Sequence, residues 1–338
     1  MFEYQTAISE LTGLPVSNAS VYEGPSAVAA AAYLAKLANG KPKVVVSRAV
    51  HPHARAALRT LAAGYGHDVV EVGLRDGVTD AQAWEQAIDD QTGAAIVAQP
   101  NFLGAVEDVE ALATAARAAA GDEIVVIGSY DPIPLGILRP PGEVGVDVAV
   151  GEGQSLGNRL DFGGPSFGFF AATQAYLRRM PGRIAGETRD VDGRRGFVLT
   201  LQTREQHIRR EKATSNICTN VALCALMATI YVAILGKRGL RKVGELSTAK
   251  AHYAARELTK IPGVRLRFAA PFFKEFTLQL PKAPERVIKR LLKDRVLAGV
   301  PLKGFDRAYK DCLLVAVTEK RTREEIDAYA AALAAAVA

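Results

Sequence analysis

Cysteine is scarce in this sequence of 338 residues. The three cysteines, Cys218, Cys224 and Cys312, form no Cys-x-x-Cys pair, which excludes a disulfide framework and gives no spacing for a metal site. The first residues also lack the charged and apolar regions of a secretory signal peptide. We therefore expect a cytoplasmic protein without a bound metal.

Aromatic residues are also few, at 7% of the chain, and no aromatic cluster accompanies the basic residues at 204–212, 237–242 and 289–295. A groove for single-stranded nucleic acid combines basic side chains with stacking aromatic rings. Apolar residues interrupt each basic cluster at helical spacing, so we interpret the clusters as solvated helix faces. We expect no nucleic-acid partner.

Long hydrophobic runs are limited to one, at residues 217–235. This run is almost entirely apolar and contains three polar residues, Thr219, Asn220 and Thr229. A membrane-spanning helix needs about 20 predominantly apolar residues, and no second run matches this one. We interpret residues 217–235 as a buried core helix rather than a membrane span, and we expect no membrane association.

The sequence does contain a regular alternation of short apolar strands and helices. Strands are predicted at 43–47, 68–72, 94–98, 123–127 and 146–150, and helices between them at 52–63, 80–89 and 106–120, with a further helix at 27–38. Val- and Ile-rich strands that alternate with helices predict an α/β fold, with a mostly parallel central sheet and helices on both faces.

The pattern changes after residue 235. Helices are predicted at 240–258, 284–293 and 323–337, and strands at 264–268, 274–280 and 312–317. These elements indicate a second, smaller α/β unit. We therefore predict a large domain at 1–235 and a small C-terminal domain at 236–338.

The loop after the strand at 146–150 contains no lysine. In enzymes of the large aminotransferase-type fold, this loop carries the lysine that holds pyridoxal phosphate (PLP) covalently. Gln154 stands at that place. An amide cannot form the covalent bond, because its nitrogen lone pair is delocalised and is not the nucleophile that this chemistry needs. The chain thus has the frame of a PLP enzyme without its covalent anchor.

Three further places can serve a PLP-type site. Gly24 and Ser26 begin a predicted helix, whose free N–H groups suit a phosphate. His51 follows the strand at 43–47 and can stack on a ligand ring, and Asp131 follows the strand at 123–127 and can pair with a protonated ring nitrogen. Each also fits a structural role, as a helix start, a loop histidine or an Asp-Pro turn.

In this order along the chain, the features resemble PLP enzymes of aminotransferase type (fold type I). Four runs narrow the resemblance: EYQTAISELTG from Glu3, EGQSLG from Glu152, FGGPSFGFFA from Phe162 and RREKATSNICTN from Arg209. They are similar to the glycine dehydrogenase (decarboxylating) family in its subunit 1 form, part of the split P-protein of the glycine cleavage system. Members carry about a hundred further residues at the N-terminus, the size of a structural extension, which we expect to be absent here.

The resemblance implies a division of labour between two subunits. PLP and its lysine belong to a homologous subunit 2, in an expected α2β2 heterotetramer, and this chain alone is expected to be inactive. Gly24, Ser26, His51 and Asp131 are then relics of a cofactor site. Glycine is the implied substrate, and the lipoyl group of the carrier H-protein is the implied acceptor of the aminomethyl group.

Thr214, Ser215 and Asn216 carry a second implication. With Ala213, they resemble a Gly-Thr-x-Asn turn that, in related PLP dimers, reaches across the interface to the partner's cofactor phosphate. Hydroxyl, amide and backbone N–H groups can all bond phosphate oxygens. The alternative is an ordinary N-cap of the helix predicted from Ile217.

Two alternatives to the two-subunit interpretation stay open. The chain can be a stand-alone PLP-fold protein that binds the cofactor noncovalently or through another lysine, of which Lys212 is the nearest candidate. It can also be a non-catalytic scaffold homodimer.

Overall fold

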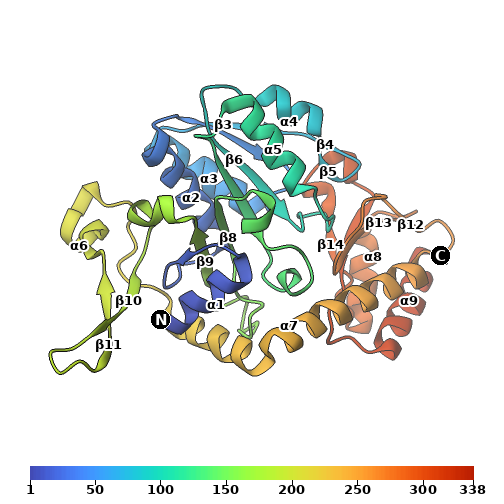
Figure 1. Ribbon diagram of the computed structural model, residues 1–338. Coiled ribbons are helices and arrows are strands. Elements are labelled where there is room, and N and C mark those ends of the chain that lie inside the picture. The colour runs from blue at the N-terminus through green and yellow to red at the C-terminus, as the bar shows by residue number, and fades with distance from the viewer. The chain divides into compact units, whose positions relative to one another are not determined.

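The computed structural model describes all 338 residues, which form two compact units (Figure 1). The large unit comprises Met1–Leu74, Thr79–Gln99 and Asp108–Leu240, and the small unit comprises Arg75–Val78, Pro100–Glu107 and Arg241–Ala338. The sequence-based division at 235/236 did not include the two short segments that the first half of the chain contributes to the small unit, because a linear pattern cannot show such an exchange.

The large unit is built on a seven-stranded sheet in the order β1-β9-β8-β7-β6-β2-β3. Strands β8, β7, β6, β2 and β3 run parallel, whereas β9 is antiparallel to β8 and β1 is antiparallel to β9. The predicted α/β fold with a mostly parallel sheet is confirmed. The strands are β1 (Val16–Ser17), β2 (Lys43–Ser47), β3 (Asp68–Val72), β6 (Thr92–Gln99), β7 (Val125–Tyr130), β8 (Val148–Glu152) and β9 (Gly168–Ala172).

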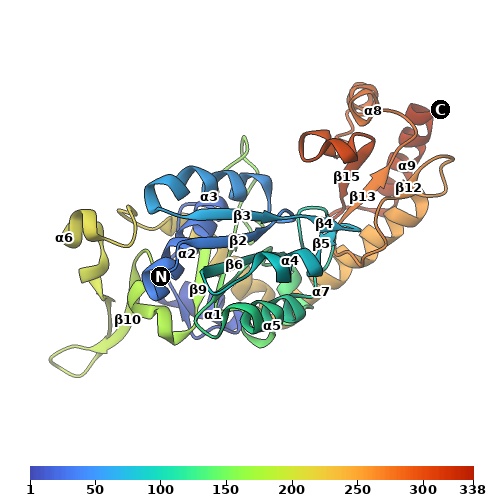
Figure 2. The same cartoon turned by 90° about the horizontal axis from the view of Figure 1, so that it is seen from above.

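Helices cover both faces of this sheet (Figure 2). Helices α2 (Gly24–Asn39) and α3 (Pro52–Tyr65) pack together on one face, and α4 (Ala81–Ala87) and α5 (Val109–Ala120) pack together on the other. Helix α1 (Phe2–Thr12) lies beside β1, β9 and a further strand, β10 (Ile184–Arg189).

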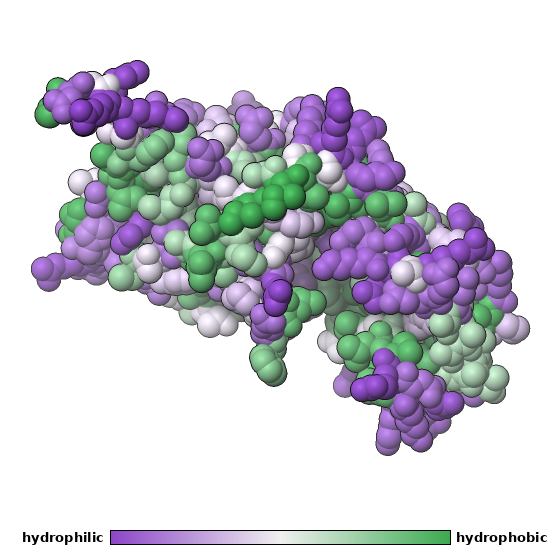
Figure 3. Space-filling model, turned by 90° about the horizontal axis from the view of Figure 1, so that it is seen from below, coloured by the Kyte–Doolittle hydropathy of each residue, from purple (hydrophilic) through white to green (hydrophobic).

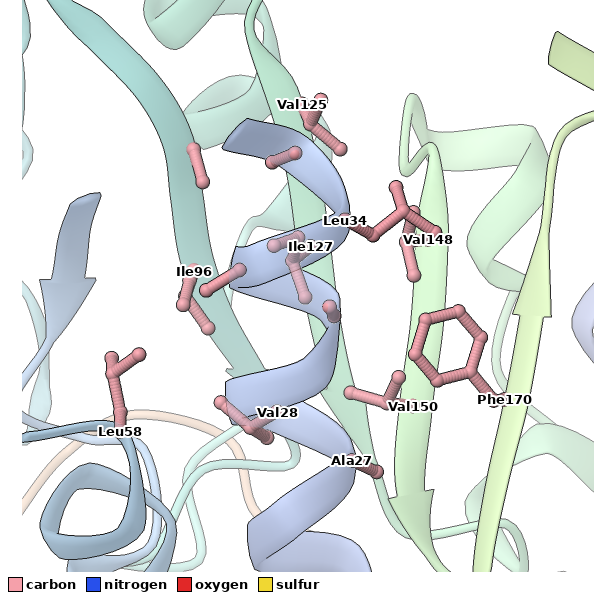
Figure 4. Close-up of a cluster of buried hydrophobic side chains, with 14 of the residues drawn as sticks. Ala27, Val28, Leu34, Leu58, Ile96, Val125, Ile127, Val148, Val150 and Phe170 are labelled. Atoms are coloured by element: carbon pink, nitrogen blue, oxygen red, sulfur yellow. The ribbon is translucent and has the colours of Figure 1, made fainter. Parts of the chain in front are cut away.

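The core on the α2 face depends on small residues in that helix. Val28 and Leu34 of α2 are fully buried among Ile96, Ile127 and Val148 of the sheet (Figure 4). Alanines fill most of the remaining buried positions of α2, so the helix backbone lies close to the strands. Each fully buried Val, Leu or Ile side chain contributes about 1.5–3 kcal/mol, and this packing holds the start of α2 near the end of β8.

The sequence pattern missed two short antiparallel pairings in the large unit. Strand β9 returns along β8, and β10 (Ile184–Arg189) pairs only with β11 (Arg195–Thr200). The β10–β11 hairpin extends away from the sheet (Figure 1). Ile184 and Ala185 are buried, whereas the other residues of the hairpin are exposed or half-buried, so neither strand is a run that is buried throughout.

The prediction of a buried core helix at 217–235 is wrong. The helix, α7, begins later, at Ala222, and runs to Leu258 with a break at Gly236, where φ is 59°. Only 22% of its most apolar 18-residue window is buried. Small side chains (Cys224, Ala225 and Ala228) face the core, whereas large apolar ones point outward. By length and composition alone, α7 is the one helix of the chain that could cross a membrane.

The first basic cluster is also not a solvated helix face throughout. Arg204 is 5% exposed; its guanidinium donates to the carbonyl oxygens of Met180 and Gly182 and lies 3.6 Å from the buried carboxylate of Glu205. A buried charge of this kind needs such partners. Local spacing does not show that loop carbonyls 22 and 24 residues away supply them.

The small unit contains an antiparallel four-stranded sheet in the order β12-β13-β15-β14. Its core joins this sheet to α8 (Pro284–Leu291), α9 (Arg323–Val337) and the later part of α7. The strands are β12 (Arg265–Leu266), β13 (Glu275–Gln279), β14 (Val300–Pro301) and β15 (Cys312–Ala316).

Candidate functional site

Gln154 lies two residues after the end of β8 (Glu152), at the place where a PLP enzyme of this fold carries its lysine. Its side-chain Nε2 donates to the carbonyl oxygens of Pro165, at 3.1 Å, and Arg159, at 3.4 Å. The residue is half-buried. Both carbonyl groups belong to the same glycine-rich loop as Gln154. The side-chain amide therefore stabilises the conformation of this loop.

Glu152, the last residue of β8, occupies the centre of this region. Its carboxylate accepts three backbone N–H groups: Gly24 at 3.0 Å, Gln154 at 3.0 Å and Phe167 at 3.2 Å. Burial raises the pKa of Glu152 above its usual value, an effect that these N–H groups oppose and the charge of Glu23 adds to. The carboxylate thus joins the end of β8 to the start of α2.

The start of α2 is packed directly against β8. A Cβ atom at Gly24 would lie 2.8 Å from the backbone nitrogen of Glu152, so only glycine fits there. The N-cap residue, Glu23, accepts the N–H of Ser26 at 2.9 Å, and the hydroxyl of Ser26 donates to the Glu23 carbonyl at 3.2 Å. The predicted helix at 27–38 therefore begins three residues earlier, at the Gly-Pro-Ser run.

Asp131 follows β7 at the same edge of the sheet, since β7 and β8 are parallel neighbours. Its Oδ1 accepts the backbone N–H of Ile133 at 3.1 Å and lies 3.4 Å from the hydroxyl of Ser155 in the Gln154 loop. The structure therefore brings Asp131 and this loop together. The hydrogen bond from Ile133 closes the Asp-Pro turn that was predicted as the structural role of Asp131.

His51 caps the helix that follows β2. Its Nδ1 accepts the backbone N–H of His53 at 3.1 Å, and the two imidazole rings meet edge to face at 4.9 Å. Partial burial, with the charges of His53 and Arg55, lowers the pKa of His51 to about 4. The imidazole is therefore neutral at pH 7 and acts as an N-cap acceptor for α3.

These residues do not fit a covalently held pyridoxal phosphate. The loop after β8 offers an amide where the covalent bond needs an amine. The N–H of Gly24, which a phosphate would use at the start of α2, already donates to Glu152. Gly24, Ser26 and Asp131 surround the end of β8, but their contacts are with this chain's own groups.

Thr214, Ser215 and Asn216 lie in an extended segment before α7, not in its first turn. Ser215 accepts the N–H of Ile217 at 3.4 Å, and Ile217 is buried in the core of the large unit. The side chains of Thr214 and Asn216 have no hydrogen-bond partner within the chain. The predicted N-cap at this place is therefore wrong, because the helix begins six residues after Asn216.

The cap of α7 comes from a distant segment. The hydroxyl of Ser20 accepts the N–H of Val221 at 3.0 Å. Ser20 has a φ of 93° and is held there by Asn18, whose Oδ1 accepts the Ser20 N–H at 3.0 Å and whose Nδ2 donates to Pro181 at 2.9 Å. Both residues are fully buried, so this turn fixes where the 214–221 segment lies.

Sequence reasoning missed Glu152 as well as Asn18 and Ser20. A signal for Glu152 was present, because a carboxylate in a run of apolar residues at a strand end must find donors when it is buried. No comparable local signal existed for Ser20, whose partner is 201 positions away in the sequence.

Comparison with known proteins agrees with this geometry. The family model described as "Glycine cleavage system P-protein" matches residues 1–333. The chain is 51% identical over 337 residues to a probable glycine dehydrogenase (decarboxylating) subunit 1 of Geotalea uraniireducens, covering 100% of this chain and 76% of that protein. A relative from Moorella thermoacetica with the same name is also 51% identical, covering 98% of this chain and 74% of its own length. The name subunit 1 implies a partner subunit 2.

Solved structures give the same answer for the fold. A crystal structure of glycine decarboxylase (P-protein) in inhibitor-bound form has a TM-score of 0.93 and 44% identity, covering 99% of this chain and 75% of that one. The sphingosine-1-phosphate lyase of Burkholderia pseudomallei, at 15% identity and a TM-score of 0.70, shows only the shared PLP-dependent transferase fold. The chain belongs to the glycine cleavage system P-protein family, as subunit 1 of its glycine decarboxylase.

Proposed function

We propose that this subunit holds no cofactor of its own and that pyridoxal phosphate is bound covalently by the lysine of subunit 2. The observation that carries this proposal is Gln154 after β8, in a loop that has no lysine between Val150 and Phe170. With an amide at this position, the chain cannot form the covalent bond on which the chemistry depends. This subunit then supplies the wall and the interface of a site in the partner.

The proposed assembly is a cytoplasmic α2β2 heterotetramer. Its complete reaction is the decarboxylation of glycine and transfer of the aminomethyl group to the lipoyl group of the H-protein. Bound pyridoxal phosphate supplies the electron sink for decarboxylation. The role of this chain is to position and cover that site.

The exposed face of α7 supports a partner of similar fold. Leu223, Leu226, Met227, Ile230 and Ile234 recur on one side of the helix at helical spacing, and all are exposed, two of them by 75% or more. Figure 3 shows a band of hydrophobic residues on the side of the molecule that carries α7 in Figure 1. A large exposed apolar patch marks an interaction site, and we assign this one, the α7 face, to subunit 2.

The segment before α7 provides the contact with the partner's cofactor in this proposal. Its backbone is anchored: Val221 donates to Ser20, and Ile217 is buried. The side chains of Thr214 and Asn216 are left without partners in the chain. Together with Ser215, they can donate hydrogen bonds to a phosphate that arrives from across the interface.

The decisive experiment measures glycine–bicarbonate exchange with each subunit alone and with both mixed. We expect exchange only in the mixture, together with co-purification of this chain and a lysine-bearing homologue. Exchange by this chain alone would favour the stand-alone interpretation. An inactive mixture, with the homologue proven to hold pyridoxal phosphate, would favour the scaffold homodimer.

A further inference from the structure

The first turn of α2 has no backbone donor left for a ligand. The first N–H groups of a helix lack partners within the helix, and this makes a helix start a binding site for anions. In α2, Gly24 donates to Glu152, Pro25 has no N–H, and Ser26 donates to the side chain of Glu23. The N–H of the next residue, Ala27, bonds the Glu23 carbonyl as the first helical hydrogen bond.

The Glu152 carboxylate, which accepts the N–H of Gly24, is held by three backbone N–H groups that we call the cradle. The three N–H groups that bond the Glu152 carboxylate come from different segments: the α2 start, the loop after β8, and the chain that leads into β9. Three converging N–H groups are the arrangement that proteins use to hold an oxyanion. Here the anion is a side chain of the same chain.

We propose that Glu152 is a built-in anion that occupies the phosphate position of the old cofactor site, so that this subunit's own cleft is closed to phosphate compounds. The Glu152 carboxylate is negatively charged, like a phosphate, and it accepts the backbone N–H groups that a phosphate would accept. It is covalently part of β8, and therefore competes at a very high effective concentration.

Electrostatics at the α2 start favour this state over phosphate binding. The helix dipole stabilises negative charge at its N-terminus, and two carboxylates, Glu23 and Glu152, already lie there. Burial raises the pKa of Glu152, and the like charge of Glu23 adds to this rise. To bind here, a phosphate dianion would have to displace Glu152 from three hydrogen bonds. It would also bring two negative charges close to Glu23.

The occupied cradle is an obstacle to cofactor binding that is separate from the missing lysine. Replacing Gln154 by lysine alone would leave the cradle occupied, so the Gln154→Lys chain is expected to bind pyridoxal phosphate no better than the original chain. The inference concerns this chain alone. Its outcome is therefore independent of subunit 2, and a failure here leaves the proposed function untouched.

The test measures the melting temperature of the isolated full chain with inorganic phosphate, against sodium chloride at matched ionic strength. Glu152→Ala frees the three N–H groups, and Glu187→Gln, at an exposed glutamate of β10, is the matched control for loss of one negative charge. We expect phosphate to raise the melting temperature of Glu152→Ala by about 2–4 °C at a phosphate concentration about ten times the dissociation constant. The original chain and Glu187→Gln should not respond.

Each other outcome would overturn the proposal. An equal rise in the original chain would mean that its cradle is open, and no response in Glu152→Ala would mean that the carboxylate does not exclude the anion. If Glu152→Ala does not fold, Glu152→Gln is measured in the same way, because it keeps the side-chain volume and removes the charge. Adding Glu23→Ser, which retains an N-cap hydroxyl, should increase the response further.

Discussion

The end of β8 and the outer face of α7 belong to the same compact unit, yet they use their bonding groups in opposite ways. At the end of β8, Glu152 and Gln154 satisfy backbone groups of their own chain. On α7, Leu226 and Ile230 are exposed, at 53% and 49%. The polar groups of the first region are bonded within the chain, whereas the second region leaves apolar surface open to solvent, which we propose is covered by subunit 2.

Under the proposed function, this contrast explains how a subunit without a covalent cofactor anchor contributes to the complex. Where a cofactor would need an amine and free N–H groups, the chain supplies an amide and a carboxylate, which stabilise the loop instead. The apolar face of α7 has no such internal substitute, because apolar surface is stabilised only by burial.

The largest effect is expected from two charges on the α7 face. The double variant Leu226→Glu/Ile230→Glu should weaken association with subunit 2 by about 100-fold or more, since each change replaces a buried apolar contact by a desolvated charge. The dissociation constant is measured by titration, and glycine–bicarbonate exchange should fall in parallel at limiting concentration.

The control for this variant is Leu297→Glu, at a leucine that is 87% exposed in the small unit. It should leave association unchanged. The melting temperature of both monomers should stay close to that of the original chain, because the replaced side chains are exposed. Unaltered association in the α7 double variant would show that this face is not the subunit interface.

A smaller effect is expected at the segment before α7. Thr214→Ala/Asn216→Ala should weaken retention of pyridoxal phosphate by subunit 2 in the assembled complex by at least about 10- to 100-fold, which is the loss expected for a single hydrogen bond to a charged group at about 1.5–3 kcal/mol. Retention is measured by dialysis and absorbance. Thr219→Ala, at an exposed threonine of the same segment, is the matched control. Equal retention in the double variant and the control would exclude the phosphate contact.

The turn that places this segment gives a stability test. Asn18→Ala should lower the free energy of unfolding by about 2–3 kcal/mol, because it leaves buried backbone groups of Ser20 and Pro181 without partners. Ser20→Ala should cost about 1 kcal/mol as a lost cap. Ser20→Gly should cost less, because glycine adopts the φ of 93° without strain. Urea unfolding ranks the three, and equal values for Ser20→Ala and Ser20→Gly would contradict the strain at this position.

The smallest effect is a pH dependence from Glu152. Burial raises its pKa in the folded chain, so the folded state binds the proton more tightly than the unfolded state does. The contribution to stability is therefore present below the ordinary pKa near 4.5 and is lost as the pH rises through the raised value. The difference in unfolding free energy between the original chain and Glu152→Gln should decrease over this window. A difference that increases with pH would mean that the three N–H groups outweigh burial.

Much of the fold could be predicted because its signal is local. The buried strand β2, the edge strand β3 and the helix α9 occur at the residues that the sequence pattern predicted. In β2 the signal is strong, since a parallel strand covered on both faces is continuously apolar. The strand β9 and the β10–β11 hairpin were missed because their antiparallel pairings lie outside the alternation of strands and helices from which the parallel strands were predicted.

In the candidate site, too, one part could be predicted from the sequence and another part could not. The absence of lysine at position 154 is a fact of composition and needs no structure. The bonds of Glu152 to Gly24 and Phe167 join residues 128 and 15 positions apart; the local sequence indicates that a carboxylate at this strand end needs donors, but it does not identify these two. The exposed α7 face was misread because a long apolar run reports hydrophobicity and does not report which side of the helix is covered.

By itself, the sequence determined the alternation of strands and helices, the family, and the lack of a nucleophilic amine after β8, because each depends on residue type and order alone. Only the tertiary structure decided that Glu152 fills the start of α2, that Ser20 caps α7, and that the large apolar side chains from Leu223 to Ile234 on the α7 face are exposed. The physical reason is that hydrogen bonds and burial are properties of pairs of residues in space, and folding alone brings those pairs together.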